Sequence, residues 1–259
     1  NAVPPAALTY GSTATMDGGV NNNNSTWFEQ GYCTNFPTYG LPPAGTTISG
    51  QDSPDHHFTL PASYTDYNAV FLDPSYNTAT IALATPGAYS ALSVLTAAGN
   101  GPGVIQAVVN HEDASIETHT ISSPDWFNAT PIIYTANGRV NVSAGTFDVL
   151  GSGNPRLYSV DFLLDNSSSP VTTIDLTYTG TGGRAAIFAL SGATGTILPV
   201  ITNQPASTSV KEGTTAQFTI GVQGSGYTYQ WQSGTGTNFT DLADGSGICA
   251  RAGGATSSA

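Results

Sequence analysis

The stretch that decides the fold class is Val104-Ile-Gln-Ala-Val-Val-Asn-His-Glu-Asp-Ala-Ser-Ile-Glu-Thr-His-Thr-Ile121. Residues that favour β-strands dominate both sides of the polar segment 112–115, which is the pattern of two strands joined by a tight turn. A two-residue turn at Asp113-Ala114 places His111 opposite Ile116 and His119 opposite Val108. The stretch therefore predicts an antiparallel hairpin in which His111 and His119 lie on opposite faces of the sheet.

Short runs of strand-favouring residues recur along the rest of the chain, separated by Gly, Pro, Asn and Asp. The sequence contains no long apolar stripe with helical spacing and capping residues. The expected strands lie at 69–72, 80–83, 91–95, 104–109, 132–135, 157–163, 171–178 and 185–190. Many short strands of this kind predict an all-β protein built as a sandwich or a barrel.

Charged residues make up only 8% of the 259 residues, against about 25% in an average soluble domain. The net charge is −12, and Lys211 is the single lysine. A nucleic-acid partner is excluded, because binding a phosphate backbone needs clustered Lys and Arg. An acidic surface rich in Gly, Ser, Thr and Asn is typical of a secreted or cell-surface protein, and it permits a neutral polysaccharide or a divalent cation as ligand.

Cysteine usage and hydropathy fit the same setting. Cys33 and Cys249 fall in different expected domains and are interpreted as free thiols. The longest apolar stretches are too short to span a membrane. No signal peptide is visible, so the start at Asn1-Ala-Val-Pro-Pro5 is interpreted as a mature N-terminus after processing.

Three motifs lie within residues 10–192: Ser123-Pro-Asp-Trp-Phe127, Gly153-Asn-Pro-Arg-Leu-Tyr158 and Ala185-Ala-Ile-Phe-Ala-Leu-Ser-Gly192. With these motifs the segment resembles the jelly-roll, galactose-binding-like β-sandwich modules of secreted bacterial proteins, a group rich in carbohydrate-binding modules. The resemblance implies a jelly-roll domain over residues 1–196 that binds sugars on an aromatic platform or with the help of calcium. Calcium is left open as a cofactor, because no Asp-rich loop specifies a site for it.

The segment that follows carries Pro199-Val-Ile-Thr-Asn-Gln-Pro205, Val210-Lys-Glu-Gly213, Ala216-Gln-Phe-Thr-Ile-Gly-Val222 and Tyr227-Thr-Tyr-Gln-Trp-Gln232. It resembles the first half of a bacterial immunoglobulin-like domain, with Trp231 at the position of that family's buried tryptophan. The later strands of such a domain are missing from the sequence. We therefore expect a partial immunoglobulin-like domain over residues 197–259, with an open sheet edge through which the chain self-associates.

The candidates for ligand contact are loop aromatics and their polar neighbours. They are Trp27, Tyr32, Trp126, Asp125 and Arg156. Aromatic rings stack on the C–H faces of sugars, while Asp and Arg side chains hydrogen-bond to the hydroxyls. The alternative for each aromatic is a place in the core, and for Arg156 an ion pair with a buried aspartate such as Asp161. The function that the sequence favours is non-catalytic binding of a neutral polysaccharide by a module of a secreted bacterial protein.

A secreted glycan-active enzyme, a hydrolase or a lyase, is the alternative function, with Glu29, His57 and His111 as its catalytic candidates. Glutamates are scarce, which leaves few choices for a pair of catalytic carboxylates. The expected strand positions turn neighbouring histidines to opposite faces, which disfavours a histidine metal site. No Gly-x-Ser-x-Gly elbow is present. A third interpretation is a structural subunit of a surface layer, an adhesin or a fibre that assembles by strand addition.

Overall fold

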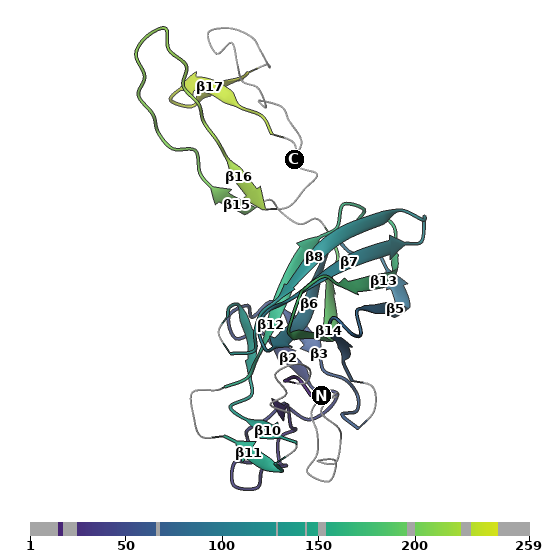
Figure 1. Ribbon diagram of the computed structural model, residues 1–259. Coiled ribbons are helices and arrows are strands. Elements are labelled where there is room, and N and C mark those ends of the chain that lie inside the picture. Colours follow the sequence, from purple (N-terminus) through teal and green to yellow (C-terminus); the bar gives the residue numbers. More distant parts are fainter. Residues whose placement is uncertain are drawn as a thin grey trace. The chain divides into compact units, whose positions relative to one another are not determined.

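The computed structural model describes residues 15–17, 25–65, 68–127, 129–142, 144–149, 154–195, 200–223 and 229–242. The chain divides into two compact units, Asn1–Gly195 and Thr196–Ala259, which Figure 1 shows as ribbons. The described residues form strands, turns and irregular segments and contain no helix. The protein is therefore all-β, as its sequence predicts.

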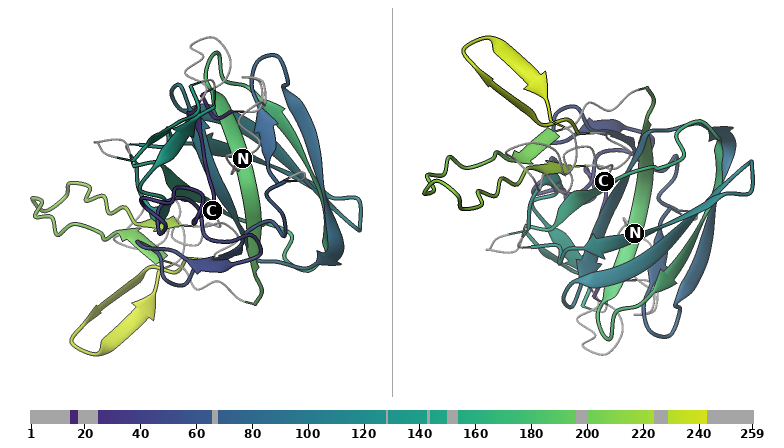
Figure 2. Two further views of the ribbon diagram at one scale, coloured as in Figure 1. Left: turned by 90° about the horizontal axis from the view of Figure 1, so that it is seen from below. Right: turned by 90° about the horizontal axis from the view of Figure 1, so that it is seen from above.

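Two antiparallel sheets form the body of the first unit, and Figure 2 shows them packed face to face. One sheet has five strands in the order β4-β14-β6-β12-β9, and the other has four in the order β5-β13-β7-β8. In chain order the strands are β4 (Val70–Leu72), β5 (Thr78–Gly87), β6 (Ala91–Gly99), β7 (Gly103–His111), β8 (Ile116–Ser123), β9 (Ile132–Thr135), β12 (Arg156–Leu163), β13 (Val171–Tyr178) and β14 (Arg184–Ala193).

The order of these strands defines the topology. Strands β4, β6, β12 and β14 lie in one sheet, and β5, β7, β8 and β13 lie in the other, so the chain crosses between sheets at most connections. All neighbours in both sheets run antiparallel. This eight-stranded double-sheet arrangement is a jelly roll, to which β9 adds an edge strand. The predicted β-sandwich is confirmed.

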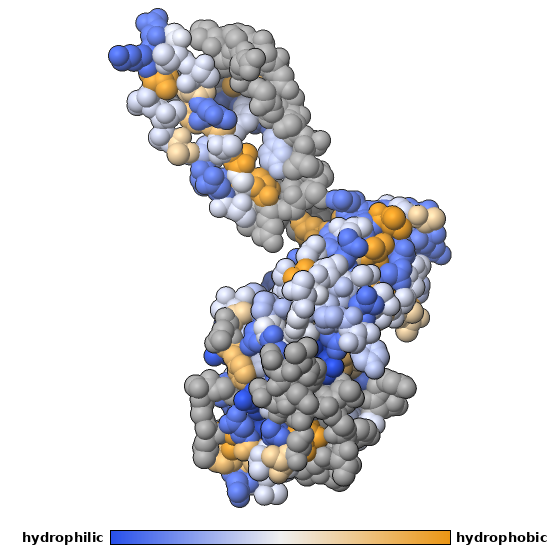
Figure 3. Space-filling model, viewed as in Figure 1, coloured by the Kyte–Doolittle hydropathy of each residue, from blue (hydrophilic) through white to orange (hydrophobic). Residues whose placement is uncertain are grey.

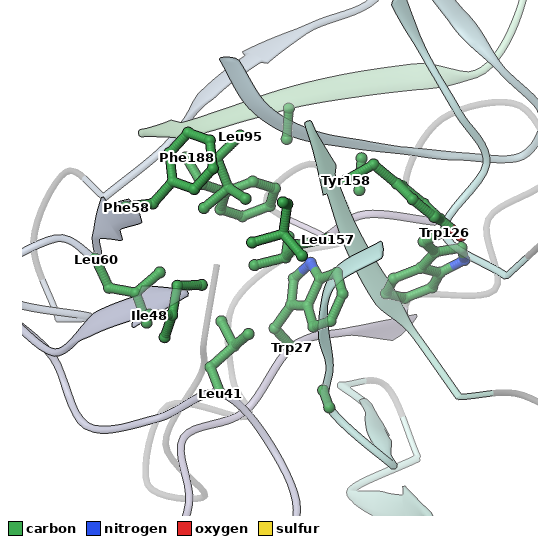
Figure 4. Close-up of a cluster of buried hydrophobic side chains, with 14 of the residues drawn as sticks. Trp27, Leu41, Ile48, Phe58, Leu60, Leu95, Trp126, Leu157, Tyr158 and Phe188 are labelled. Carbon is green, nitrogen blue, oxygen red and sulfur yellow. The ribbon is translucent and has the colours of Figure 1, made fainter. Parts of the chain in front are cut away.

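The five-stranded sheet is covered by apolar side chains on both faces. Between the two sheets, Val94 of β6 belongs to the same buried cluster as Ile105 of β7 and Ile174 of β13. On the other face, Leu95 of β6 belongs to a second cluster that includes Trp27 and Phe58, drawn in Figure 4. A single strand therefore supplies two cores by alternation of its side chains.

Short strands outside the sandwich complete the first unit. A hairpin of β2 (Thr47–Ser49) and β3 (His57–Thr59) supplies Ile48 and Phe58 to the second cluster. A small sheet contains β1 (Ser25–Thr26), β10 (Arg139–Asn141) and β11 (Thr146–Asp148). These strands are not predictable from the sequence, because segments of two or three residues are too short to show an alternating pattern.

The hairpin register predicted from the sequence is wrong by one residue. Ile116 pairs with Asn110, and His119 pairs with Ala107. His111 donates its amide hydrogen to the carbonyl of Ser115, which leaves a three-residue loop in which Ala114 has a positive φ of 67°. A one-residue slip moves every side chain of one strand to the other face. His111 and His119 therefore lie on the same face of the sheet.

The second unit contains two pairs of short strands in its described residues. They are β15 (Val200–Asn203) with β16 (Gly221–Gln223), and β17 (Gln232–Thr235) with β18 (Asn238–Asp241). Where burial is described, none of its residues is fully buried. Trp231 is only partly buried, contrary to the expected core position, with its ring 6.4 Å from that of Phe218.

Apolar side chains of the second unit remain on its surface. Val210 and Phe218 are about half exposed and Phe239 somewhat more, and Figure 3 shows such residues in orange among paler ones. Self-association through this unit stays a prediction. Cys249 lies outside the described residues, and the other cysteine, Cys33, is a buried free thiol.

The loop of the β7–β8 hairpin predicts a stabilising substitution. Ala114→Gly should raise stability by about 1 kcal/mol, because a left-handed backbone costs about that much for a residue with a Cβ and nothing for glycine. We expect the melting temperature of the first unit to rise by roughly 2–4 °C, measured by calorimetry. The control, Ala82→Gly at an exposed position of β5, should lower the melting temperature. A decrease in both variants would contradict the assigned loop conformation.

A buried ion pair predicts a dependence of stability on acid. Arg184 donates to Asp73 through Nε and Nη2, at 3.1 and 2.8 Å. Burial opposes ionisation of Asp73, but hydrogen bonds from Arg184 and from the Tyr76 and Ser75 amides outweigh it and hold the pKa below the ordinary 3.8. The folded protein thus binds this proton more weakly than the unfolded chain does. The pair stabilises fully above pH 4, and this contribution is lost as the pH falls through the lower folded value.

Asp73→Asn should therefore destabilise the protein by about 3 kcal/mol at pH 7, because it removes the carboxylate that pairs with a buried guanidinium. The difference from the unsubstituted protein should shrink between pH 4 and pH 2, followed by denaturant unfolding at each pH. Asp241→Asn, at an exposed position of the second unit, is the control and should follow the unsubstituted protein. A difference that stays constant with pH would contradict the role given to the Asp73 charge.

Candidate functional site

The two tryptophans proposed as ligand contacts lie in the core. Trp27 is 0% exposed and Trp126 is 1% exposed. Their rings meet edge to face with centroids 5.3 Å apart, and Trp27 also contacts Phe188. Figure 4 shows both side chains among buried apolar residues. In this position neither ring has a face free to stack on a sugar. The two tryptophans therefore occupy core positions, as in the alternative interpretation, and do not contact a ligand.

Asp125 and Arg156 hold loops in place beside this core. Asp125 accepts hydrogen bonds from the amides of Gly101 and Phe127, at 2.9 and 3.2 Å. Arg156 donates through Nη1 to the carbonyl of Phe127 at 2.9 Å. The alternative ion pair of Arg156 with Asp161 is not formed, because the two residues lie five positions apart in β12 and point to opposite faces of the sheet. Asp161 instead accepts from Ser93. Both side chains therefore connect backbone segments around Trp126, which is a supporting role.

Tyr32 is the one predicted contact that lies in an exposed aromatic group. We call residues 30–40, Gln-Gly-Tyr-Cys-Thr-Asn-Phe-Pro-Thr-Tyr-Gly, the aromatic loop. Tyr32, Phe36 and Tyr39 are partly exposed in it. The rings of Phe36 and Tyr39 are stacked, with centroids 5.1 Å apart and planes 26° apart. These rings pack on a small apolar cluster that includes Phe28 and Val140.

Backbone hydrogen bonds fix the shape of the aromatic loop. The Phe36 amide donates to the Cys33 carbonyl, and the Tyr39 amide donates to the Phe36 carbonyl. At the end of the loop, the Gly40 amide donates to Ala136. Gly40 has a φ of 99°, and an added Cβ would lie 2.4 Å from the Phe28 carbonyl oxygen, so only glycine fits there. The aromatic side chains therefore stand on a rigid support.

The polar side chains within the aromatic loop carry no charge. The side-chain amide of Gln30 donates to the Thr38 carbonyl at 3.0 Å and to the Tyr134 hydroxyl at 2.9 Å. Residues 30–40 contain no Asp, Glu, Lys or Arg. Phe36 and Tyr39 were not among the predicted contacts. Their signal in the sequence is an aromatic pair spaced three residues apart around a Pro-Thr turn, next to Gly40.

The three candidates of the enzyme interpretation are placed in different parts of the fold. Glu29 precedes the aromatic loop and accepts from the amide of Ala44 at 3.1 Å. His57 lies in β3 and shares a hydrogen bond with Ser49 at 2.9 Å, and His111 is buried at the end of β7. Among the described residues no hydrogen bond or ion pair joins any two of the three. The structure does not bring these candidates together.

His111 takes part in a polar cluster that the hairpin register creates. Its Nε2 lies 2.9 Å from a carboxyl oxygen of Glu117, and its Nδ1 lies 3.0 Å from the Ser169 carbonyl. Both ring nitrogens of His111 are therefore within hydrogen-bond distance of an oxygen atom. His119 approaches the second Glu117 oxygen at 3.3 Å and stacks on Phe162.

Glu117 is the centre of this cluster and also holds the connection between β12 and β13. It accepts from the amides of Asp165 and Asn166, at 2.7 and 2.9 Å. Burial opposes its ionisation, but these amides and the two histidines outweigh burial and hold the pKa of the Glu117 carboxyl below its usual value. His111 and His119 each contact a different oxygen of the Glu117 carboxylate, and their nitrogens do not converge on one site that could hold a ligand. The cluster is therefore structural, and we call His111, Glu117 and His119 the clasp.

The remaining histidine, His56, bridges two aspartates on the other side of the five-stranded sheet. Its ring nitrogens lie 3.0 Å from Asp55 and 3.0 Å from Asp161. Burial opposes protonation of His56, but the hydrogen bond to Asp55 and the charge of Asp161 outweigh it and raise the pKa of the ring. Asp161 also accepts from Ser93. This order, with a carboxylate between serine and histidine, lacks the serine–histidine contact of a nucleophilic triad.

The sequence matches no model of a known protein family, and a search among curated proteins finds no significant match. Over the described parts of the chain, no group of three or more His, Cys, Asp and Glu side chains is arranged to hold a metal ion. The same residues include no helix long and apolar enough to cross a membrane. The family resemblance and calcium as a cofactor remain predictions.

The conformation of the loop between β12 and β13 should depend on the Glu117 carboxylate. Glu117→Gln should destabilise the first unit by about 2 kcal/mol, because it replaces one of the two accepting oxygens by an amide that cannot accept. Hydrogen exchange of the Asp165 and Asn166 amides should become at least tenfold faster. Glu112→Gln, at an exposed position of the same hairpin, is the matched control and should exchange as the unsubstituted protein does. Unchanged exchange in Glu117→Gln would show that the clasp does not hold the loop.

Proposed function

We propose that the first unit binds a neutral polysaccharide through the aromatic loop, without chemical conversion of the ligand. The observation that carries this proposal is the stacked pair of Phe36 and Tyr39, partly exposed on a fixed loop. Sugar rings offer apolar C–H faces that stack on aromatic rings. Two rings held in place before binding lose little conformational entropy when a ligand settles on them.

The charge distribution supports an uncharged ligand. The aromatic loop contains no ionisable acid or base other than tyrosine and cysteine, in a chain with a net charge of −12. An anionic glycan would meet the overall negative potential of the protein without a local basic group to offset it. Thr34, Asn35 and Thr38 are exposed in the loop, and their hydroxyl and amide groups suit the hydroxyls of a neutral sugar. We also propose that the protein is secreted, because neutral structural polysaccharides lie outside the cell.

The proposal predicts a loss of binding on removal of either ring. Phe36→Ala and Tyr39→Ala should each weaken retention on an insoluble neutral polysaccharide about fivefold, since an aromatic contact contributes on the order of 1 kcal/mol. Retention is measured as adsorption isotherms on cellulose, chitin and a β-1,3-glucan. Tyr76→Ala, which removes a tyrosine that is 67% exposed outside the loop, is the matched control and should bind normally.

The same samples are assayed for newly released reducing ends. Soluble products formed by the unsubstituted protein would contradict the non-catalytic part of the proposal and would favour a glycan-active enzyme. Equal retention of the Tyr39→Ala and Tyr76→Ala variants would contradict the aromatic loop as the binding site. Near-identical melting curves for the three variants are required, because the rings also cover Phe28 and Val140.

A further inference from the structure

The aromatic loop is tied to the five-stranded sheet through the hydroxyl group of Tyr134. Tyr134 lies in β9, where it pairs with Leu157 of β12, and its ring packs against the buried cluster that includes Trp27. Its hydroxyl donates to the carbonyl of Gly40 at 3.1 Å and accepts from the side-chain amide of Gln30 at 2.9 Å. This oxygen atom, fixed on the sheet, therefore contacts both ends of the loop.

The side-chain amide of Gln30 extends the same network into the loop. Its second hydrogen is donated to the carbonyl of Thr38 at 3.0 Å. Thr38 and Gly40 are the chain neighbours of Tyr39, one of the two stacked rings. Tyr134 and Gln30 thus hold the carbonyl groups of the residues on both sides of Tyr39.

The donor hydrogens of these two side chains are all engaged. A primary amide has two N–H hydrogens to donate, and a phenol hydroxyl donates one hydrogen while it accepts another. Burial raises the pKa of the Tyr134 hydroxyl, so at neutral pH the hydroxyl keeps the proton that it donates to Gly40. Hydrogen bonds connected in a chain of this kind strengthen one another.

The loop needs a support of this kind, because much of its surface lies in solvent. Thr34, Asn35, Pro37 and Thr38 are all exposed. Residues that bury little surface gain little free energy to offset the conformational entropy that is lost when they are fixed. Side-chain hydrogen bonds from a strand of the sheet supply the missing constraint. A ring pair that is fixed before binding loses less entropy when a ligand settles on it.

We propose that Tyr134 and Gln30 are positioning residues of the aromatic loop, which hold Phe36 and Tyr39 in the arrangement that accepts a sugar ring. The inference rests on the proposed function, because it concerns the same site and the same class of neutral polysaccharide. Neither side chain is required to touch the ligand. Each acts through a carbonyl group of the loop, so its removal should weaken binding although both rings remain present.

The test removes one hydroxyl and keeps the ring that carries it. We expect Tyr134→Phe to bind the best-retained of cellulose, chitin and a β-1,3-glucan about fivefold more weakly, the factor that corresponds to the loss of an ordinary hydrogen bond. Hydrogen exchange of the Tyr39 and Gly40 amides should become about fivefold faster. The matched control is Tyr178→Phe, which removes a hydroxyl that donates to Gly182 from the cluster between the two sheets. It should leave both the affinity and these two exchange rates unchanged.

A double variant tests whether the two positioning residues act as one unit. Gln30→Ala removes both hydrogen bonds of the amide and should also weaken binding about fivefold. Members of one hydrogen-bond network are coupled, so Gln30→Ala/Tyr134→Phe should lose less than the product of the two single factors. A loss equal to that product would overturn the shared network. Binding is measured at 25 °C, where melting curves must show every variant to be folded.

Parallel measurements on Tyr39→Ala separate this inference from the proposed function. Weak binding by Tyr39→Ala and Tyr134→Phe, with normal binding by Tyr178→Phe, supports the positioning role. Normal binding by Tyr134→Phe with weak binding by Tyr39→Ala overturns that role and leaves the proposed function intact. Equally weak binding by Tyr134→Phe and Tyr178→Phe also overturns it, because the loss then follows from reduced stability in general. If the unsubstituted protein binds none of the polysaccharides, both proposals fail.

Discussion

Burial of the five-stranded sheet on both faces is the constraint on which the rest of the first unit depends. Strand β6, Ala91–Gly99, is buried along almost its whole length, because Val94 faces the other sheet and Leu95 faces the cluster around Trp27. Apolar burial contributes about 25 cal/mol for each Å², so a sheet covered twice is the most stabilising layer of the fold. The N-terminal segments that supply Trp27 and Phe58 are needed to cover its second face.

Much of the sandwich could be predicted from the sequence, because its strands are long and rich in β-branched residues. Seven of the eight expected ranges coincide with strands that are equal or longer, and the range 69–72 differs from β4 by one residue. The register of the β7–β8 hairpin was harder to predict. It depended on whether Ala114 adopts a left-handed conformation, and alanine does so rarely. That single backbone choice decides that His111, Glu117 and His119 share one face, and so creates the clasp.

The site was predicted only in part, for a different physical reason. An aromatic residue in a loop-like sequence can face solvent or cover a sheet, and the sequence does not show which. Trp27 follows four asparagines closely, yet it belongs to the buried cluster that covers the second face of the sheet, because that face needs large apolar side chains. Tyr32, five residues later, remains partly exposed. The difference lies in long-range packing, which local composition does not encode.

The arginines of the first unit, Arg139, Arg156 and Arg184, are engaged inside it, and this shapes what its surface can recognise. Arg139 lies between Asp17 and Asp148, at 3.1 Å from each. Burial raises the pKa of Asp17 to about 6 in spite of the opposing charge of Arg139. Arg184 is likewise held by Asp73. With its cations committed in this way, the unit has hydroxyl, amide and aromatic groups left for recognition. Contacts of these groups are short-ranged and little affected by salt, so selectivity must come from the fit of a ligand to fixed positions. The aromatic loop provides such positions on a rigid backbone.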